Sequence, residues 1–175
     1  SLYGMVTLLE MDSTKQKDVK HLIPQLITRF KQTSNLVNNL LNWAKSQMEG
    51  YKVIPEVFNI HDLIDENIKL LQSKFDEKGI IVYHHINENS FVYADKNMIN
   101  LVVLNLLSNA QKYSDSDDKV SIKSVIKDNE VEFEVNDTGV GIPQNSIKEL
   151  FNHSFYTTSG TRNENGTGLG LMLCK

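Results

Sequence analysis

The first fifty residues carry a seam of mostly apolar positions that alternate three and four residues apart, a spacing typical of coiled coils and helical bundles. The seam consists of Ile23, Leu26, Phe30, Thr33, Val37, Leu40, Ala44 and Gln47, widened by Ile27, Ser34, Leu41 and Met48. Ahead of it, "LYGMVTLLEM" also predicts a helix, and the polar "DSTKQKD" predicts a connection. We therefore expect residues 1–50 to form a helical hairpin.

A hairpin of two helices buries too little apolar surface to be stable by itself. We expect residues 1–48 to form a homodimer, in which two hairpins build a four-helix bundle. The alternative is that the hairpin packs against its own chain.

The helical periodicity stops around "EGYKVIPEVFN", where a glycine and Pro55 indicate a linker over residues 51–58. Asn59 then has the character of an N-cap for a helix that runs to about Lys78 and is closed by Gly79. This position marks the start of a second domain, over residues 59–175.

The second domain alternates between strand and helix patterns. "IIVYHHI" and "FVYA" predict strands with the turn "NENS" between them, and an apolar helix follows from Asn97 to Lys112. After the polar loop "SDSDD", the runs "VSIKSVIK" and "EVEFEVN" predict a hairpin. Its second strand has Val131, Phe133 and Val135 facing inward and Glu130, Glu132 and Glu134 facing outward. The whole chain is predicted to be α+β, with a two-layer α/β sandwich whose helices cover one face of a mixed sheet.

Composition narrows the possible functions. The 175 residues carry a formal net charge of -4 with both signs interspersed, which gives no electrostatic reason to expect nucleic-acid binding. The single cysteine, Cys174, excludes an internal disulfide and a cysteine metal cluster, and it suits a reducing compartment. No window approaches eighteen apolar residues, and the start of the chain lacks the pattern of a signal peptide. We expect a soluble chain, which could still be part of a membrane protein.

The helix "NLVVLNLLSNAQKYS" carries an unusual polar stripe. Asn105, Asn109 and Lys112 are spaced i, i+4 and i+7, so they share one face of an otherwise apolar helix. A solvated stripe would usually be charged, and asparagine is a poor helix former. A stripe that faces a ligand explains these residues better, because an asparagine oxygen suits Mg²⁺ held mainly by phosphates. Lys112 could then neutralise phosphate charge, with Tyr113 close by.

Two glycine clusters flank an irregular segment. In "DTGVGIP", Asp137 follows a strand, and Gly139 and Gly141 allow the backbone to approach a ligand closely. A carboxylate at this position can accept hydrogen bonds from the amino group of adenine, where guanine has a carbonyl. The second cluster contains Gly166, Gly168 and Gly170 and leads into a helix, an arrangement suited to phosphate. The spacing matches neither a Rossmann fingerprint nor a P-loop.

Taken in order, these motifs closely resemble the boxes of sensor histidine kinases, within the gyrase, chaperone, histidine kinase and MutL superfamily. "NLLSNAQKYS", "DTGVGIP", "LFNHSFYTTS" and "GTGLGL" resemble its N box, first glycine box, phenylalanine box and second glycine box. The segment ending "LVNNLLNWAKSQ" is similar to the second helix of its dimerisation and phosphotransfer domain. The resemblance implies a Bergerat-type ATP-binding fold, the ligands ATP and Mg²⁺, and a response-regulator receiver domain as partner.

The resemblance also implies roles for individual residues. Asn109 would be the Mg²⁺ ligand, Lys112 a catalytic residue on the phosphates, and Asp137 the residue that reads adenine. The segment "FNHSFYTTSGTRNE" between the glycine clusters would be a mobile lid, and Arg162, its only lysine or arginine, a weaker candidate for a phosphate contact. The complete set expected to contact ATP is Asn105, Asn109, Lys112, Tyr113, Asp137, Gly139, Gly141, Ile142, Phe151, Phe155, Arg162, Gly166, Thr167, Gly168, Leu169 and Gly170. Of these, Phe151 and Phe155 would anchor the lid to the core.

The sequence departs from the family pattern at the phosphoacceptor box. The family carries an H-[ED]-x-x-x-P box on the first helix, and the sequence has no such box. None of the five histidines (His21, His61, His84, His85 and His153) has the required context. By alignment with the family, the acceptor histidine would lie roughly eight residues before Ser1, and the chain would be a fragment that also stops early in its last helix. We expect a cytoplasmic location, with any membrane contact made through segments outside residues 1–175.

Asn105 bears on the reaction that the site would support. Related hydrolysing ATPases and serine kinases place a glutamate, acting as general base, one turn before the metal-binding asparagine, and Asn105 cannot accept a proton. A neutral histidine nitrogen is already nucleophilic and needs no such base. The sequence therefore favours a protein-histidine kinase over a hydrolysing ATPase. A regulatory module that binds a nucleotide with little catalysis is the other alternative.

Overall fold

The computed structural model describes residues 23, 24, 27, 30, 33, 34, 37, 52–128, 130–147, 150, 158–164, 168 and 170–174. The chain divides into two compact units, Ser1–Met48 and Glu49–Lys175. In the first unit, all described residues are helical and exposed. The first helix of the expected hairpin, the connection and half of the seam lie outside the described residues, so the hairpin and its dimerisation stay predictions.

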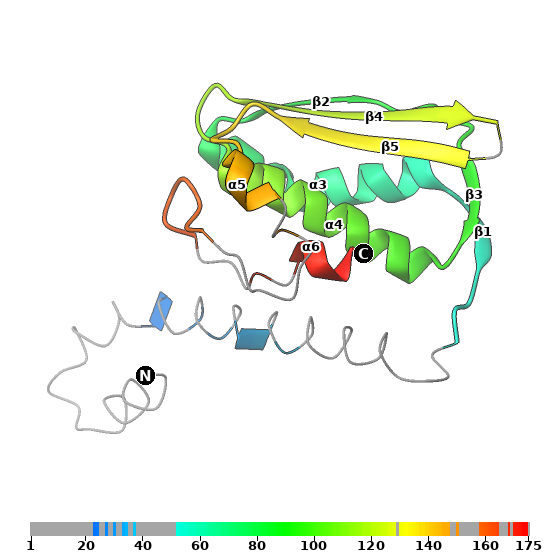
Figure 1. Ribbon diagram of the computed structural model, residues 1–175, viewed down its shortest axis with the longest axis horizontal. Coiled ribbons are helices and arrows are strands. Elements are labelled where there is room, and N and C mark those ends of the chain that lie inside the picture. The colour runs from blue at the N-terminus through cyan, green and yellow to red at the C-terminus, as the bar shows by residue number, and fades with distance from the viewer. Residues whose placement is uncertain are drawn as a thin grey trace, which may run out of the picture. The chain divides into compact units, whose positions relative to one another are not determined.

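The second unit begins its helical layer with α3, Ile60–Lys78 (Figure 1). The side chain of Asn59 caps this helix by accepting a hydrogen bond of 3.0 Å from the amide of His61. At the other end, Gly79 has a φ of 73° and donates its N–H to carbonyls of the last turn. Glycine adopts this left-handed conformation without the strain that a Cβ would cause. Both predicted ends of the helix are confirmed.

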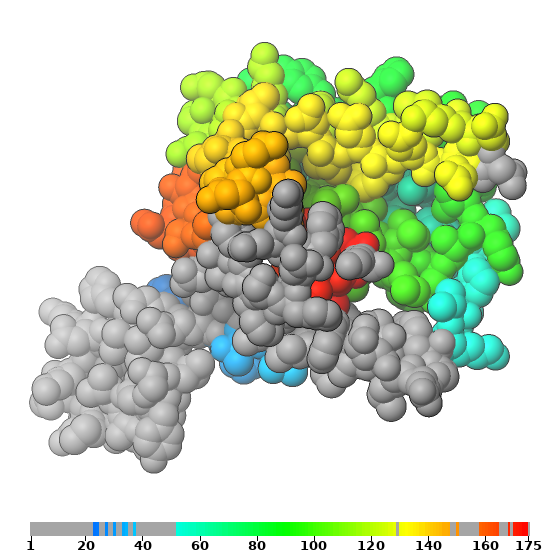
Figure 2. All heavy atoms as spheres, viewed as in Figure 1, coloured from blue at the N-terminus to red at the C-terminus, as the bar shows by residue number. Residues whose placement is uncertain are grey.

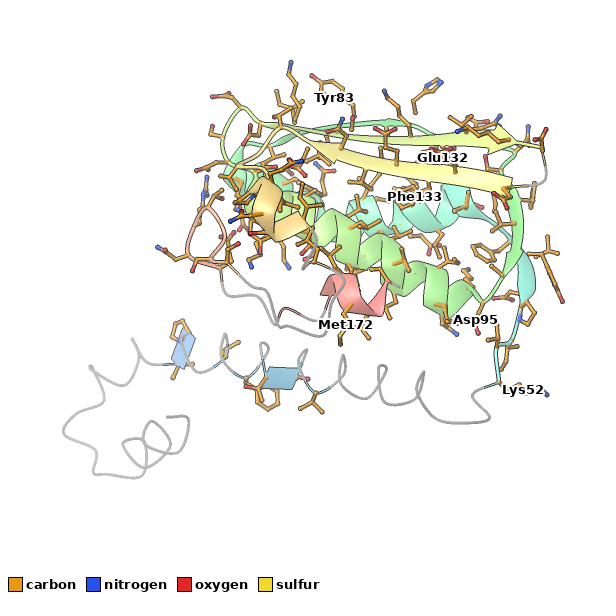
Figure 3. All side chains as sticks on the ribbon, viewed as in Figure 1. Lys52, Tyr83, Asp95, Glu132, Phe133 and Met172 are labelled. Carbon is orange, nitrogen blue, oxygen red and sulfur yellow. The ribbon has the colours of Figure 1, made fainter. Side chains whose placement is uncertain are left out.

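A three-stranded mixed sheet forms the second layer, with strand order β2-β4-β5. Its strands are β2 (Ile81–His85), β4 (Lys119–Lys127) and β5 (Glu130–Asp137). Strand β4 runs parallel to β2 and antiparallel to β5. The predicted hairpin is confirmed, and so is its alternation, because Phe133 packs against the core while Glu132 is exposed. Figure 3 shows Tyr83 on the outer side of the sheet and Phe133 on the side of the helices.

Strand β1, Glu56–Asn59, is an element that the sequence analysis missed. It pairs antiparallel with β3, Phe91–Ala94. Phe58 is buried in the core, whereas its neighbour Val57 is exposed. The linker expected over residues 51–58 therefore ends in a strand. Four residues next to a proline give too short a pattern to predict a strand, and pairing with β3 stabilises it.

Helix α4, Lys96–Tyr113, lies beside α3, and both helices cover the same face of the three-stranded sheet (Figure 1). Asp95 caps α4 by accepting hydrogen bonds from the amides of Asn97 and Met98. The core between the layers includes side chains that are completely buried, namely Ile64, Phe75, Val103, Leu107, Val120 and Ile122. The predicted α+β class and the two-layer sandwich are confirmed.

Two short helices complete the described part of the second unit. They are α5, Gln144–Ile147, and α6, Gly170–Leu173. Helix α6 contacts α4, so the start of the last predicted helix lies against the polar stripe of α4. Among the residues that the structure describes, no helix is long and apolar enough to cross a membrane.

Candidate nucleotide-binding site

The structure describes most of the residues predicted to contact a nucleotide, and helix α4 carries four of them. Four predicted residues lie at or just after the end of β5, namely Asp137, Gly139, Gly141 and the exposed Ile142. Gly168 and Gly170 lie at the start of α6. Predicted positions outside the described residues are Phe151, Phe155, Gly166, Thr167 and Leu169.

Asn105 lies against the start of α6. A Cβ added to Gly170 would come 2.9 Å from the Asn105 side-chain oxygen, so a larger residue at this position would displace the Asn105 side chain. The Asn105 side-chain nitrogen is buried and has no hydrogen-bond partner among the described residues. A buried amide without a partner is costly, and an anion at this position would satisfy it. Asn109, one turn further along the same face, is half-buried.

Lys112 is buried at the end of the polar stripe. Its Nζ donates hydrogen bonds of 2.9 Å to the Tyr113 hydroxyl and 2.9 Å to the Thr158 carbonyl. An ammonium has three donors, so one remains for a phosphate oxygen as far as the described residues show. Burial raises the pKa of the Tyr113 phenol, but hydrogen bonds with Lys112 and Thr158 and the charge of Lys112 outweigh it, and the pKa lies below its ordinary value.

The first glycine box begins at the exposed end of β5. The Asp137 carboxylate accepts a hydrogen bond of 3.0 Å from the Gly139 amide through one oxygen, Oδ1. The Val140 amide then donates to the Tyr113 carbonyl at 3.1 Å, which brings the box against the end of α4. Asp137 is therefore held beside the polar stripe, and its second oxygen has no hydrogen bond from the described residues.

The two glycines of this box differ in what surrounds the position of a Cβ atom. A Cβ on Gly139 would overlap the Tyr113 carbonyl oxygen, so this glycine is required by the neighbouring helix rather than by a ligand. Gly141 has a φ of 66° and open space around its Cβ position. Close approach of a ligand, which the sequence analysis expected at both positions, is consistent with Gly141 alone.

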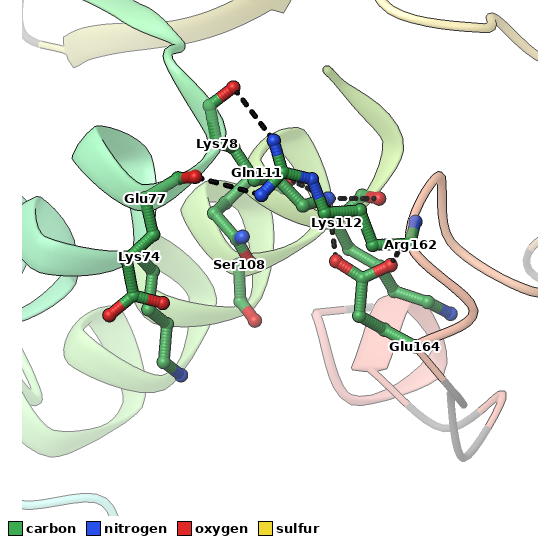
Figure 4. A pocket seen from close by; sticks show the side chains of 8 residues that line it. All are labelled: Lys74, Glu77, Lys78, Ser108, Gln111, Lys112, Arg162 and Glu164. Carbon is green, nitrogen blue, oxygen red and sulfur yellow. Dashed lines mark hydrogen bonds and ion pairs between the residues drawn. The ribbon is translucent and has the colours of Figure 1, made fainter. Parts of the chain in front are cut away.

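Arg162 contacts helix α3 rather than the polar stripe. Its guanidinium donates hydrogen bonds of 2.7 Å to the Glu77 carbonyl and 3.2 Å to the Lys78 carbonyl (Figure 4). It also lies 3.4 Å from the Asp115 carboxylate. These contacts use three of the five N–H donors and direct the guanidinium toward the end of α3, so the structure gives no support to the expected phosphate contact of Arg162.

A polar cavity of about 360 Å³ lies between α3, α4 and the segment 158–164. Lys74, Glu77, Lys78, Ser108, Gln111, Lys112, Arg162 and Glu164 line it (Figure 4). It includes Lys112 and Arg162 but none of the other predicted residues. On the helical wheel, Asn105 and Asn109 lie on the opposite side of Lys112 from Ser108 and Gln111. The cavity is thus adjacent to the predicted nucleotide site, and the two share Lys112.

Sequence reasoning missed two charged residues of this cavity, Lys78 and Glu164. The Lys78 Nζ lies 2.5 Å from a Glu164 carboxylate oxygen. Burial raises the pKa of the Glu164 carboxyl, but hydrogen bonds from Lys78 and backbone amides outweigh it, so its pKa lies below the ordinary value. The sequence offered one signal for Lys78, its place in the last turn before Gly79. Lysines are common at the ends of helices, so this signal did not distinguish Lys78.

Comparison with known proteins places the chain in a family. Residues 94–175 match the family model described as histidine kinase-, DNA gyrase B-, and HSP90-like ATPase. The catalytic domain of the histidine kinase ThkA is 31% identical, with a TM-score of 0.60, over 69% of this chain and 77% of that chain. The chain belongs to the histidine kinase family. The four boxes in the sequence are explained by common ancestry with these kinases.

Other histidine kinases are similar over more of the chain. Sensor protein SrrB of Staphylococcus aureus is 29% identical over 164 residues, which are 93% of this chain and 28% of that protein. The chain thus spans less than a third of the length of this relative. The histidine kinase AdeS of Acinetobacter baumannii shares the fold, with a TM-score of 0.72 and 20% identity over 99% of this chain and 79% of that chain. ThkA in complex with the response regulator TrrA also shares it, with a TM-score of 0.69 and 22% identity over 91% of this chain and 46% of that chain.

Proposed function

We propose that this histidine kinase chain binds Mg²⁺-ATP beside the polar stripe of α4 and donates the γ-phosphoryl group to a histidine. The buried, unpartnered amide of Asn105 beside Gly170 carries the proposal. Asn105 and Lys112 share one face of α4, and the glycine box that contains Gly141 is joined to the end of the same helix by the hydrogen bond from the Val140 amide to the Tyr113 carbonyl. A nucleotide phosphate placed there would satisfy both donors.

The residues present fit a nucleotide with a metal ion. Asn109 would offer a neutral oxygen to Mg²⁺, and Lys112 would place a positive charge beside the phosphates. No group of three or more histidine, cysteine, aspartate or glutamate side chains in the described part of the chain could hold a metal ion. Mg²⁺ would thus take most of its ligands from phosphates and water, and when bound it supplies neutralisation of phosphate charge.

The free oxygen of Asp137 would accept a hydrogen bond from the adenine amino group. Asp137 itself is oriented by the Gly139 amide, and the box is oriented by the Tyr113 carbonyl. Guanine would present a carbonyl to this carboxylate, and the two acceptors would repel each other. The site is therefore expected to prefer ATP over GTP.

The acceptor is proposed to be a histidine because the position one turn before Asn109 holds Asn105. An asparagine cannot remove a proton from water or from a hydroxyl group, whereas a neutral imidazole needs no base to attack. Because the chain belongs to the histidine kinase family, we propose that the phosphoryl group then passes to a response-regulator aspartate. The ThkA–TrrA complex supports this kind of partner.

Calorimetry with Asn109 variants tests the nucleotide site. Asn109→Ala and Asn109→Asp should abolish Mg²⁺-dependent ATP binding and leave the thermal unfolding midpoint close to that of the wild-type chain. Asn97→Ala, at an exposed position in the first turn of the same helix, is the matched control and should bind normally. Unchanged affinity in the Asn109 variants would refute the metal assignment.

Labelling with γ-labelled ATP tests the reaction. A chain extended ahead of Ser1 by a helix with the family's H-[ED]-x-x-x-P box should become labelled, and the label should be labile in acid and stable in base. Replacing the histidine of that box should remove the label, while His21→Ala should leave it. Binding of ATP without any label would favour the regulatory module, and release of free phosphate instead would favour the hydrolysing ATPase.

A further inference from the structure

Lys78, at the end of α3, joins three parts of the second unit. Its side chain is only 3% exposed, and its Nζ lies within hydrogen-bond distance of carbonyls at the end of α4. These carbonyls belong to Gln111 at 2.9 Å, Lys112 at 3.0 Å and Ser114 at 3.1 Å. A cation is favourable here because the carbonyls that end a helix carry partial negative charge.

The same ammonium holds the segment 158–164. It pairs with Glu164 at 2.5 Å (Figure 4). It also donates to the Thr161 hydroxyl at 2.8 Å. The Thr161 hydroxyl donates in turn to the Ser114 carbonyl at 2.8 Å. We call Lys78, Thr161 and Glu164 the Lys78 cluster. Its contacts are polar and link α3, α4 and the segment, although these parts are far apart in the sequence.

The segment itself is folded into a tight turn against α4. The Gly160 amide donates to the Glu164 carbonyl at 2.9 Å, and the Asn163 amide donates to the Gly160 carbonyl at 3.0 Å. A Cβ on Gly160 would come 2.8 Å from the Lys112 carbonyl oxygen and 2.5 Å from a Glu164 carboxylate oxygen. No side chain fits at Gly160 unless the turn moves away from α4.

Lys112 is tied to this segment at both its backbone and its side chain. Its carbonyl accepts from the Thr161 amide at 3.1 Å and from the Lys78 ammonium, and its own ammonium donates to the Thr158 carbonyl. Figure 2 shows the segment 158–164, in orange, at the surface of the molecule. A displacement of the segment would therefore move the partner that orients the Lys112 ammonium.

We propose that the Lys78 cluster is a positioning device for the nucleotide site: it holds the segment 158–164 in the place where Thr158 orients Lys112. The proposal rests on the proposed function, because Lys112 is assigned there to the phosphates. Lys78 touches neither the predicted metal ligand nor the adenine-reading carboxylate. Its effect on the nucleotide passes through the turn at Gly160 and through Lys112.

Lys78→Met tests the proposal with two measurements. ATP affinity measured by calorimetry should fall about tenfold. Without any nucleotide, hydrogen exchange at the Thr161 and Asn163 amides should become faster, because their hydrogen bonds depend on the position of the turn. Lys74→Met is the matched control, since Lys74 lines the same cavity one helical turn earlier but is exposed. It should change neither quantity.

Two substitutions at Thr161 separate positioning from folding. Thr161→Val removes the hydroxyl with little change of shape and should weaken ATP binding and speed exchange at Asn163. Thr161→Ser keeps the hydroxyl and should restore both quantities towards wild type. This pair decides the proposal if Lys78→Met does not fold.

The proposal is overturned if folded Lys78→Met and Thr161→Val proteins keep wild-type ATP affinity and wild-type exchange. It is also overturned if Lys74→Met has effects as large as those of Lys78→Met, because the charge of the cavity would then matter rather than the cluster. A wild-type chain that binds no ATP would refute the proposed function instead. In that case the exchange measurements alone would still show whether the cluster holds the segment.

Discussion

The residue Gly139 shows why a glycine in a motif does not always mark a ligand. Its Cβ position is filled by the carbonyl oxygen of Tyr113, and its amide orients the Asp137 carboxylate. Gly141, two residues later, has a left-handed backbone and open space beside it. The first glycine thus joins the box to α4, and only the second leaves room for a nucleotide.

Glu164 provides a prediction about pH at the residue scale. Burial raises its pKa, but the hydrogen bond with Lys78, the backbone hydrogen bonds and the charge of Lys78 together outweigh burial, so the pKa lies below the ordinary value of 4.5 in the folded chain. A depressed carboxyl pKa contributes stability that is complete above the unfolded pKa and is lost as the pH falls through the folded pKa. The free energy of unfolding of wild type minus that of Glu164→Gln should therefore be constant near neutral pH and should shrink below about pH 4.5.

Urea unfolding of both proteins at a series of pH values measures this difference. Glu77→Gln, at an exposed residue that lines the same cavity, serves as the control. A difference between wild type and Glu164→Gln that grows on acidification would contradict the assigned ion pair.

At the scale of elements, the ends of α3 and α4 are held by cations from elsewhere in the second unit. The Lys78 ammonium binds carbonyls at the end of α4, and the Arg162 guanidinium binds carbonyls at the end of α3. Each cation lies where the helix carries partial negative charge. The two helix ends and the segment 158–164 therefore form one polar assembly, distinct from the apolar core between α3, α4 and the sheet.

Asp95 gives a prediction at the scale of elements, because it joins the start of α4 to the chain ahead of β1. One oxygen of its carboxylate caps α4, and the other accepts a hydrogen bond of 3.0 Å from the Ile54 amide. These backbone bonds, the one from Ile54 foremost, lower the pKa of Asp95. Asp95→Ala should lower the thermal midpoint by a few degrees and speed hydrogen exchange at the Ile54 amide.

Asp95→Asn keeps one acceptor oxygen and should lose less stability than Asp95→Ala. Calorimetric midpoints and exchange rates of the two variants compare them directly. Equal midpoints for Asp95→Ala and wild type would show that the carboxylate does not stabilise this junction.

At the scale of the whole molecule, the first unit carries apolar side chains that are exposed in its described part. Among its described residues, Ile23, Ile27, Phe30 and Val37 are exposed, Phe30 to 67%. These four belong to the predicted face of the bundle helix. Their exposure supports the proposal that a second copy of the chain covers this face through residues 1–48.

Leu40→Glu tests this dimer, because the glutamate would place an unpaired charge in the seam and cost several kcal/mol. Sedimentation should show a dimer for the wild-type chain and a monomer for the variant. Leu70→Glu is a suitable control, since Leu70 is exposed on α3 in the second unit. A wild-type chain that is monomeric at high concentration would contradict the predicted dimer.

The sequence by itself determined the elements whose signals are local. Three features could be predicted because each involves residues within a few positions of one another. They are the cap at Asn59, the left-handed glycine at Gly79 and the alternation along Glu130–Asp137. The polar stripe from Asn105 to Lys112 is readable for the same reason, since the helical period places it on one face. The resemblance to the family boxes then predicted the nucleotide site.

Only the tertiary structure decided the pairings between distant residues. Strand β1 needs β3, more than thirty residues later, and the four residues of β1 have no pattern of their own. The contact between Lys78 and Thr161 spans 83 positions, and no local rule predicts which carbonyls a lysine at a helix end will reach. Such contacts depend on how the layers pack, because packing brings the ends of α3 and α4 together and leaves a buried ammonium there that needs acceptors.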